Sequence, residues 1–186
     1  MKKMWLVLTL MAAVFPLAAA AQQLRSIASV MDTQLMREEQ EFTGAAEAMP
    51  EDKYGFAPTN GEFKGVRTFA EQVRHVAMFN YRFGSAILGE KPPASIEGPN
   101  ENGPVEIKTK AQILQYLKDS FAYGHKAFAT LNEQRALEPV KTDLGDTRLG
   151  IAALNLRHCR DHYGQMVEYL RMNNIIPPAS RPRPAR

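Results

Sequence analysis

Two of the four histidines in this 186-residue chain, His158 and His162, are four residues apart in a stretch that reads as helix. Side chains with this spacing lie one above the other on the same helical face, which is how a helix offers two imidazole nitrogens to one metal ion. A third histidine, His75, lies in another stretch that reads as helix. Three neutral imidazoles leave one position of a tetrahedral ion open, which is the arrangement of a metal site that does chemistry. We therefore expect these three histidines to bind one divalent ion.

The neighbours of the three histidines favour a site at the inner face of the helices. Leu156 and Tyr163 flank the pair, and Val76 and Phe79 follow His75. An exposed pair of histidines with no ion is the alternative. If an ion is bound, protons are expected to compete with it as the pH falls below the usual imidazole pKa of about 6.5.

His125 and Cys159 could in principle also bind a metal, but their sequence surroundings differ from those of the three histidines. His125 precedes Lys126, and we expect it at the edge of the fold or in solvent rather than on a metal. Cys159 is the single cysteine, so an intramolecular disulfide is excluded. It lies about 100° around the helix from His158, which favours a small buried core residue over a ligand or nucleophile.

Several common site motifs are missing from the sequence. There is no His-Glu-x-x-His of the zinc proteases and no Glu-x-x-His pair of the di-iron bundles. There is also no Cys-x-x-Cys-His for covalent haem, no glycine-rich phosphate loop and no Gly-x-Ser-x-Gly nucleophile turn. The three histidines are thus the main chemical signal in the chain.

Four segments have helical periodicity, and none alternates with the period of two that is typical of a strand. The predicted helices run from about Leu24 to Ala48, from Thr68 to Gly89, from Thr109 past Leu131, and from Asp146 or Thr147 to about Asn173. Thr68 with Glu71, and Thr109 with Gln112, have the spacing of capping boxes. Four amphipathic helices predict an all-α four-helix bundle. The long connections 50–67 and 89–108 either form part of a site or cover the end of the bundle.

The N-terminus has the layout of a secretory signal peptide. Lys2 and Lys3 precede an apolar run over residues 5–15, and a stretch of small residues ends at Ala21. We expect cleavage before Gln22 and export to the periplasm or the medium. The residue directly after the expected cleavage point is Gln22 and not a cysteine, so we expect no lipoprotein anchor. The apolar run is also short for a membrane span. An uncleaved N-terminal anchor is the alternative.

The mature chain of 165 residues is predicted to form one domain. Residues 22–176 are expected to form the bundle, and residues 177–186 a disordered tail rich in Pro and Arg. The net charge of +3 falls to +1 without the signal peptide, so no nucleic-acid partner is expected. The tail is too short and weakly charged to hold the mature chain on a membrane. A small-molecule substrate and a homodimer are left open.

Two stretches resemble the DinB-like superfamily, which comprises damage-inducible metalloenzymes. The stretch from Leu149 to Arg171, with its two histidines and the following Pro177-Pro178, resembles the last helix of that family. Residues 68–77 resemble its second helix, which carries the first metal ligand. The similarity spans nearly all of the mature chain. It implies an up-up-down-down bundle with one divalent metal held by His75, His158 and His162.

The resemblance also implies a reaction class. Some relatives are transferases or isomerases that use a low-molecular-weight thiol, and three neutral ligands favour acidifying a bound water or thiol. The resemblance therefore implies a metal-dependent hydrolase or a thiol/group transferase of unknown substrate. Zinc is the ion that we expect first, with nickel, iron or manganese as alternatives. The thiols of such enzymes are cytoplasmic, whereas this chain carries an export signal.

Three further residues lie near the expected ligands in sequence. Asn155 and Gln165 are about one turn from the histidine pair, and Glu71 is one turn before His75. Each is a candidate for orienting a ligand or a substrate, with the capping box as the favoured role of Glu71. The rival function is a non-catalytic bundle or stress protein with a structural or vacant metal site. A pocket at the fourth coordination position would distinguish the two.

Overall fold

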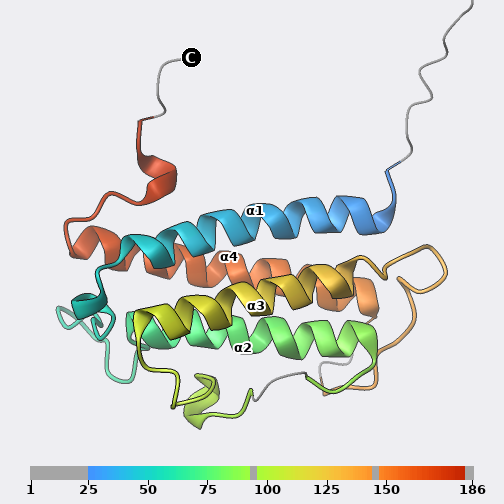
Figure 1. The fold of residues 1–186 in the computed structure, drawn as a ribbon, viewed down its shortest axis with the longest axis horizontal. Helices are drawn as coiled ribbons and strands as arrows, with labels where there is room; N and C mark the ends of the chain where they lie inside the picture. The colour runs from blue at the N-terminus through green and yellow to red at the C-terminus, as the bar shows by residue number, and fades with distance from the viewer. Residues whose placement is uncertain (1–24, 93–95, 144–146, 183–186) are drawn as a thin grey trace, which may run out of the picture.

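The computed structural model describes residues 25–92, 96–143 and 147–182, and four long helices dominate this part of the chain (Figure 1). The helices are α1 (Ile27–Ala48), α2 (Phe69–Leu88), α3 (Lys110–Phe128) and α4 (Arg148–Met172), and three short 3-10 turns are η1 (Glu51–Lys53), η2 (Pro99–Glu101) and η3 (Pro178–Ser180). Within the described ranges, β structure is limited to an isolated bridge between Pro139 and Thr147. The prediction of an all-α four-helix bundle is confirmed. The predicted signal peptide, residues 1–21, lies outside the described residues.

The beginning of each helix is set by a local cap. Ser26, Thr68, Thr109 and Thr147 each accept a hydrogen bond from a backbone N–H three residues further on. Such caps satisfy donors that have no partner in the first turn of a helix. Both predicted capping boxes, at Thr68 and Thr109, are present. Gly89 ends α2 in the left-handed conformation, with φ of 77°. None of the described helices is long and apolar enough to cross a membrane.

The order of helix directions differs from the one that the resemblance implied. In the contacts between α2 and α3, Asn80 bonds Ser120 and Ser85 bonds Tyr123, so the residue numbers rise together and the two helices are parallel. By the same argument α1 is antiparallel to α3, because Glu39 of α1 bonds His125 whereas Glu47 of α1 bonds Lys118. The expected up-up-down-down order is therefore wrong, and the bundle is up-down-down-up (Figure 1).

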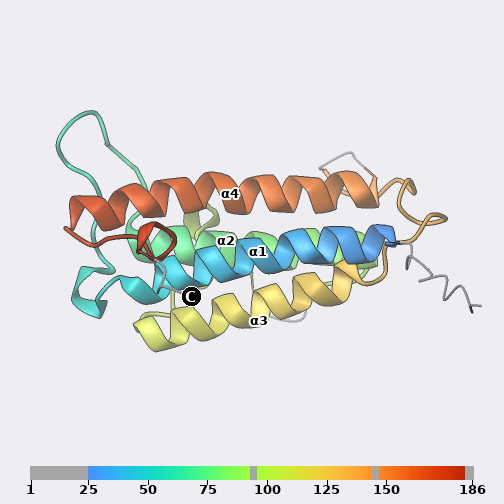
Figure 2. The same ribbon diagram turned by 90° about the horizontal axis from the view of Figure 1, so that it is seen from above.

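The connection after α2 makes this order feasible. Parallel neighbours require a connection that returns along the whole helix, and the 20 residues of α2 span about 30 Å. The 21 residues between Leu88 and Lys110 can reach about twice that distance when extended. In Figure 2 α1 lies in front of α2, with α4 on one side of the pair and α3 on the other. The helices α1 and α2 therefore occupy opposite corners of the bundle.

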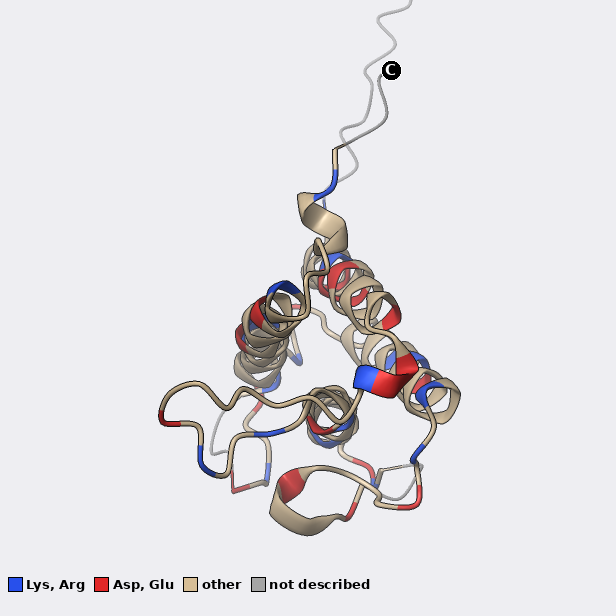
Figure 3. Ribbon diagram, turned by 90° about the vertical axis from the view of Figure 1, so that its left-hand side faces the viewer, with Lys and Arg blue, Asp and Glu red and all other residues tan. Residues whose placement is uncertain are grey.

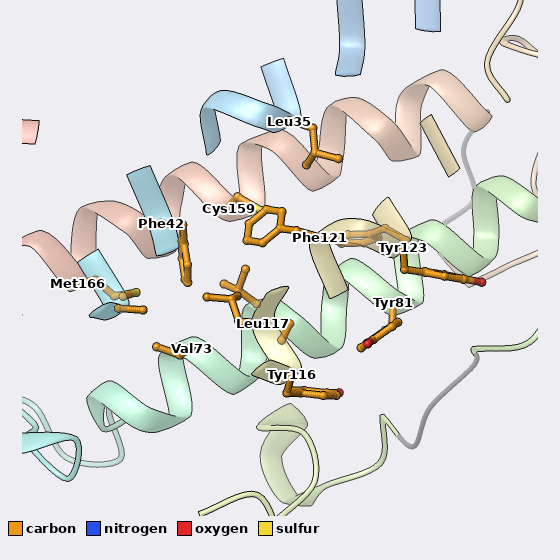
Figure 4. Packing of buried hydrophobic residues seen from close by; sticks show 14 of the residues in the cluster. Leu35, Phe42, Val73, Tyr81, Tyr116, Leu117, Phe121, Tyr123, Cys159 and Met166 are labelled. Carbon is orange, nitrogen blue, oxygen red and sulfur yellow. The ribbon is translucent and has the colours of Figure 1, made fainter. Parts of the chain in front are cut away.

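The core lies along the axis of the bundle and contains large apolar side chains from all four helices (Figure 4). Its fully buried aromatic residues are Phe42, Phe69, Phe83, Phe121 and Phe128. Cys159 is completely buried among them, as predicted, and burial raises the pKa of its thiol. The end-on view in Figure 3 shows charges of both signs around the outside.

The first part of the predicted disordered tail is ordered. Pro177 is buried, and Pro178 in η3 lies against Gly44 of α1. The apolar contact between the proline ring and α1 orders the turn. Residues 183–186 lie outside the described part of the chain.

His125 lies half-buried between α3 and α1. Its Nδ1 contacts Asp32 Oδ1 at 2.5 Å, and its Nε2 contacts Glu39 Oε2 at 3.1 Å. Burial lowers the pKa of His125, but the hydrogen bonds to the two carboxylates outweigh burial and leave the pKa above 6.5. A protonated His125 therefore ties α1 to α3, which places it at the bundle edge with a structural partner on each nitrogen.

The variant His125→Gln is expected to be destabilised by about 1 kcal/mol at pH 6, and by less at pH 9. Because the folded pKa is raised, the stabilisation is complete below 6.5 and is lost as the pH rises through the folded pKa. Urea unfolding at both pH values measures the difference. Lys118→Gln is the control, since the ion pair of Lys118 with Glu47 joins the same two helices without a histidine. An equal cost of His125→Gln at both pH values would contradict the assignment.

Candidate metal centre

His75 of α2 and both His158 and His162 of α4 come together at one point between the two helices. The nitrogen atoms that they offer lie within 4.8 Å of one another. The Nε2 atoms of His75 and His158 are 3.1 Å apart, and the three ring centroids are separated by 4.5 to 5.0 Å. His75 and His162 are 4% and 6% exposed, and His158 is partly buried.

The register of α2 against α4 brings the histidines together. Gln72 of α2 bonds Gln165 of α4, and three residues later His75 meets His158. The residue numbers fall on α4 as they rise on α2, so the helices are antiparallel. In this register His75 faces the gap between His158 and His162, whose four-residue spacing places them on one face of α4.

Hydrogen bonds at the outer nitrogens determine the tautomers of two of the histidines. Nδ1 of His75 lies 2.6 Å from the backbone oxygen of Glu101, and Nδ1 of His162 lies 2.6 Å from Oε1 of Gln72. A carbonyl oxygen only accepts, so each Nδ1 must carry the proton. Each neutral ring then has its lone pair on Nε2. This is the arrangement by which proteins orient imidazole ligands of a metal.

The donor set fits a divalent transition ion. Two nitrogens that each lie about 2.0–2.1 Å from a tetrahedral zinc ion are about 3.3 Å apart, close to the 3.1 Å between Nε2 of His75 and Nε2 of His158. Imidazole is a suitable ligand for zinc, nickel and iron, so the residues leave the identity of the ion open.

The environment keeps all three rings neutral. Burial lowers the pKa of His75, and it lowers the pKa of His162 to about 4. Burial, and then the neighbouring His162 and His75, lower the pKa of His158 to about 2. Neutral imidazole is the form that binds a metal. Protons are thus weaker competitors here than at an exposed histidine.

Gln72 is a positioning residue that the sequence analysis missed. Its Oε1 contacts His162, and its Nε2 donates to Oε1 of Gln165 at 2.8 Å. Gln165 in turn donates to Oδ2 of Asp161 at 3.1 Å. Gln165 thus contacts Gln72 rather than a histidine, and Gln72 is 1% exposed. The available signal was its place three residues before His75, on the same helical face.

Glu71 and Asn155 do not contact the histidines. Oε2 of Glu71 accepts hydrogen bonds from the backbone and the hydroxyl of Thr68, which is the capping role that the sequence favoured. Asn155 is fully buried, and its Oδ1 lies 3.4 Å from the sulfur of Cys159. Asn155 therefore belongs to the core of the bundle rather than to the ring of groups that orient the ligands.

The loop around η2 covers one side of the histidines. Asn100 and Glu101 have φ of 55° and 57°, a left-handed conformation that is costly for glutamate. Arg67 holds this loop, because its guanidinium donates to Oδ1 of Asn102 at 2.6 Å and to the backbone oxygen of Asn100 at 3.1 Å. The strained backbone thereby presents the carbonyl of Glu101 to His75.

His158 differs from the other two histidines of the cluster. Its Nδ1 is buried without a hydrogen-bond partner among the described residues. Aromatic rings hold it instead, with the centroid of Phe79 at 4.6 Å and that of Phe83 at 5.7 Å. A pocket of about 340 Å³ opens beside it, lined by Leu154, Arg157, His158 and Asp161. The cluster therefore reaches solvent at His158.

Comparison with known proteins places this arrangement in a family context. The family model of the DinB superfamily matches residues 34–166, a range that includes all three histidines. A crystal structure titled as a conserved protein from Enterococcus faecalis superposes with a TM-score of 0.64. It is 16% identical in sequence, and the match covers 80% of this chain and 97% of that chain, which shows a shared fold. No curated protein matches the sequence.

Proposed function

Because the chain belongs to the DinB superfamily, we propose that it binds one divalent metal ion through His75, His158 and His162. One observation carries the proposal: the hydrogen bonds to Glu101 and Gln72 leave the Nε2 lone pairs of His75 and His162 free for one ion. Buried neutral nitrogens on two rigid helices are held for binding with little reorganisation. Zinc is the proposed ion.

The proposed activity is that of a metal-dependent hydrolase or thiol/group transferase. A divalent ion held by three neutral imidazoles supplies Lewis acidity to an oxygen or sulfur ligand. The protein residues orient the imidazoles through Gln72 and Glu101, while Phe79 and Phe83 cover His158 with apolar surface. The pocket beside His158 supports a reactive site over a closed structural one, because a substrate requires access to the ion.

Export to the periplasm or the medium is part of the proposal, and it rests on the N-terminal sequence alone. The basic start, apolar run and small-residue stretch before Gln22 support it. The mass of the chain recovered from outside the cytoplasm distinguishes a cleaved from an uncleaved N-terminus.

Titration of zinc into the chelator-treated protein is expected to give one bound ion per chain, still bound at pH 5.5. Exposed histidines would release the ion as the pH falls through about 6.5. Here burial lowers the pKa of His162 to about 4, so proton competition begins at lower pH than the sequence suggested. Metal content after dialysis at pH 7.5, 5.5 and 4 measures this. Release centred near pH 6.5 would contradict a buried cluster, and the absence of stoichiometric binding at pH 7.5 would overturn the proposed function.

A further inference from the structure

The pocket beside His158 is formed by a single face of α4. Leu154, Arg157, His158 and Asp161 line it, and their spacing of three, four and seven residues places them side by side. His75 and His162 are almost completely buried, so this is where the cluster meets solvent. Its volume of about 340 Å³ is within the range of small-molecule pockets. A molecule that reaches the histidines from here lies against these four side chains.

Arg157 has no partner for its charge. It is exposed, and no described residue forms an ion pair or a hydrogen bond with it. Four other arginines on α2 and α4 are neutralised, since Arg82, Arg148, Arg160 and Arg171 each pair with a carboxylate. Asp161, one turn away and in the same pocket, accepts a hydrogen bond from Nε2 of Gln165 instead. The guanidinium of Arg157 is thus available to a ligand.

A second arginine without a carboxylate partner among the described residues, Arg67, is held by the loop that contacts His75. Among the described residues, the guanidinium of Arg67 bonds only the neutral oxygens of Asn102 and Asn100, so its charge is fixed in place but not compensated there. The loop that holds it also bonds His75. With three neutral ligands, a bound divalent ion would add to this positive charge.

We propose that the pocket on α4 binds a small organic oxyanion, a carboxylate or a phosphate, with Arg157 as its anchor and Leu154 against its apolar part. This inference rests on the proposed metal site, because the ion supplies part of the attraction. A guanidinium binds either group through two parallel hydrogen bonds. The carboxylate of Asp161, which also lines the pocket, would repel a second anionic group on the ligand. We therefore expect ligands with a single anionic group.

The test is calorimetric titration of the zinc-loaded full chain with benzoate, phenyl phosphate and benzamide. Benzoate or phenyl phosphate is expected to bind at least tenfold more tightly than neutral benzamide, and the tighter of the two identifies the anionic group. Arg157→Gln is expected to weaken that binding by about tenfold or more, because a hydrogen bond to a charged group is worth about 1.5–3 kcal/mol. Arg157→Lys should restore part of it.

Arg160→Gln is the matched control, since Arg160 is also exposed on α4 but pairs with Glu38 and Glu41 of α1. It should leave anion binding unchanged. Metal content is measured for every variant. If the ion is bound and Arg157→Gln binds the anions as the unmodified chain does, or if benzamide binds equally well, the oxyanion pocket is overturned and the metal site stands. If no variant or parent holds zinc, the proposed function falls, and this inference with it.

Discussion

Replacing His162 with alanine is expected to abolish tight metal binding. The substitution removes one of three ligands, so the loss in affinity should exceed the 10- to 100-fold that the loss of an outer hydrogen-bond partner costs. Two imidazoles remain, and they come from different helices. Metal content after gel filtration, together with a competitive chelator titration, measures the change.

The same variant separates the ion's effect on stability from its effect on function. An ion bound by the three histidines would join α2 to α4, and free metal at 100 times its dissociation constant should then stabilise the protein by about 2.7 kcal/mol. For a domain of this size that is a rise in melting temperature of roughly 5–10 °C. His162→Ala should melt at the same temperature with and without chelator. An unchanged temperature in the unmodified chain would show that the bundle stands without the ion.

His125→Ala is the matched control for this experiment. It removes the one histidine outside the cluster, whose nitrogens contact Asp32 and Glu39 instead. It should keep the full metal content, although it is less stable. Equal metal content in His162→Ala and the unmodified chain would eliminate the three-histidine site, and loss of metal in His125→Ala would move the site elsewhere.

Replacing Gln72 with leucine is expected to lower metal affinity by 10- to 100-fold without removing a ligand. The amide oxygen of Gln72 holds the proton of His162 on Nδ1, and leucine leaves that buried donor without a partner. The unsatisfied donor costs about 1–3 kcal/mol. The ring is also free to turn its Nε2 away from the ion. Chelator competition measures the affinity, and circular dichroism verifies the helices.

Two further variants show whether Gln72 acts through its oxygen. Gln72→Glu keeps an acceptor for His162 and should retain most of the affinity. Gln165→Leu removes only the outer partner of the Gln72 amide and should have a smaller effect than Gln72→Leu. If Gln72→Leu binds zinc as tightly as the unmodified chain, the hydrogen bond does not orient the ligand. If Gln72→Glu loses as much as Gln72→Leu, packing rather than hydrogen bonding explains the effect.

The helices and the three histidines could be predicted because the relevant information is local. A threonine cap acts on a backbone N–H three residues away, as at Thr68 and Thr109, and the sequence contains both partners. The spacing of His158 and His162 places them on one face of α4 in any fold that keeps this helix. The apolar neighbours of His75 likewise indicated which face of α2 is buried.

The helix directions and the groups that orient the ligands depend on contacts between distant segments. The length of the connection after Leu88 permits either direction for α3, so the sequence did not exclude the up-up-down-down order. Gln72 is 90 residues from His162, and Glu101 is 26 residues from His75. Only the register of α2 against α4 and the left-handed backbone at Glu101 bring these oxygens to the imidazoles.

The sequence alone therefore determined which residues offer lone pairs, and the tertiary structure decided where those lone pairs point. Residue type and helical period specify a donor and its face. The tautomer of His75 depends on the nearby carbonyl of Glu101, and the charge of Arg157 stays unpaired because no described carboxylate contacts it. In a bundle, such acceptors come from other helices and loops. Hydrogen bonds act over about 3 Å, so these properties arise only when the helices have packed.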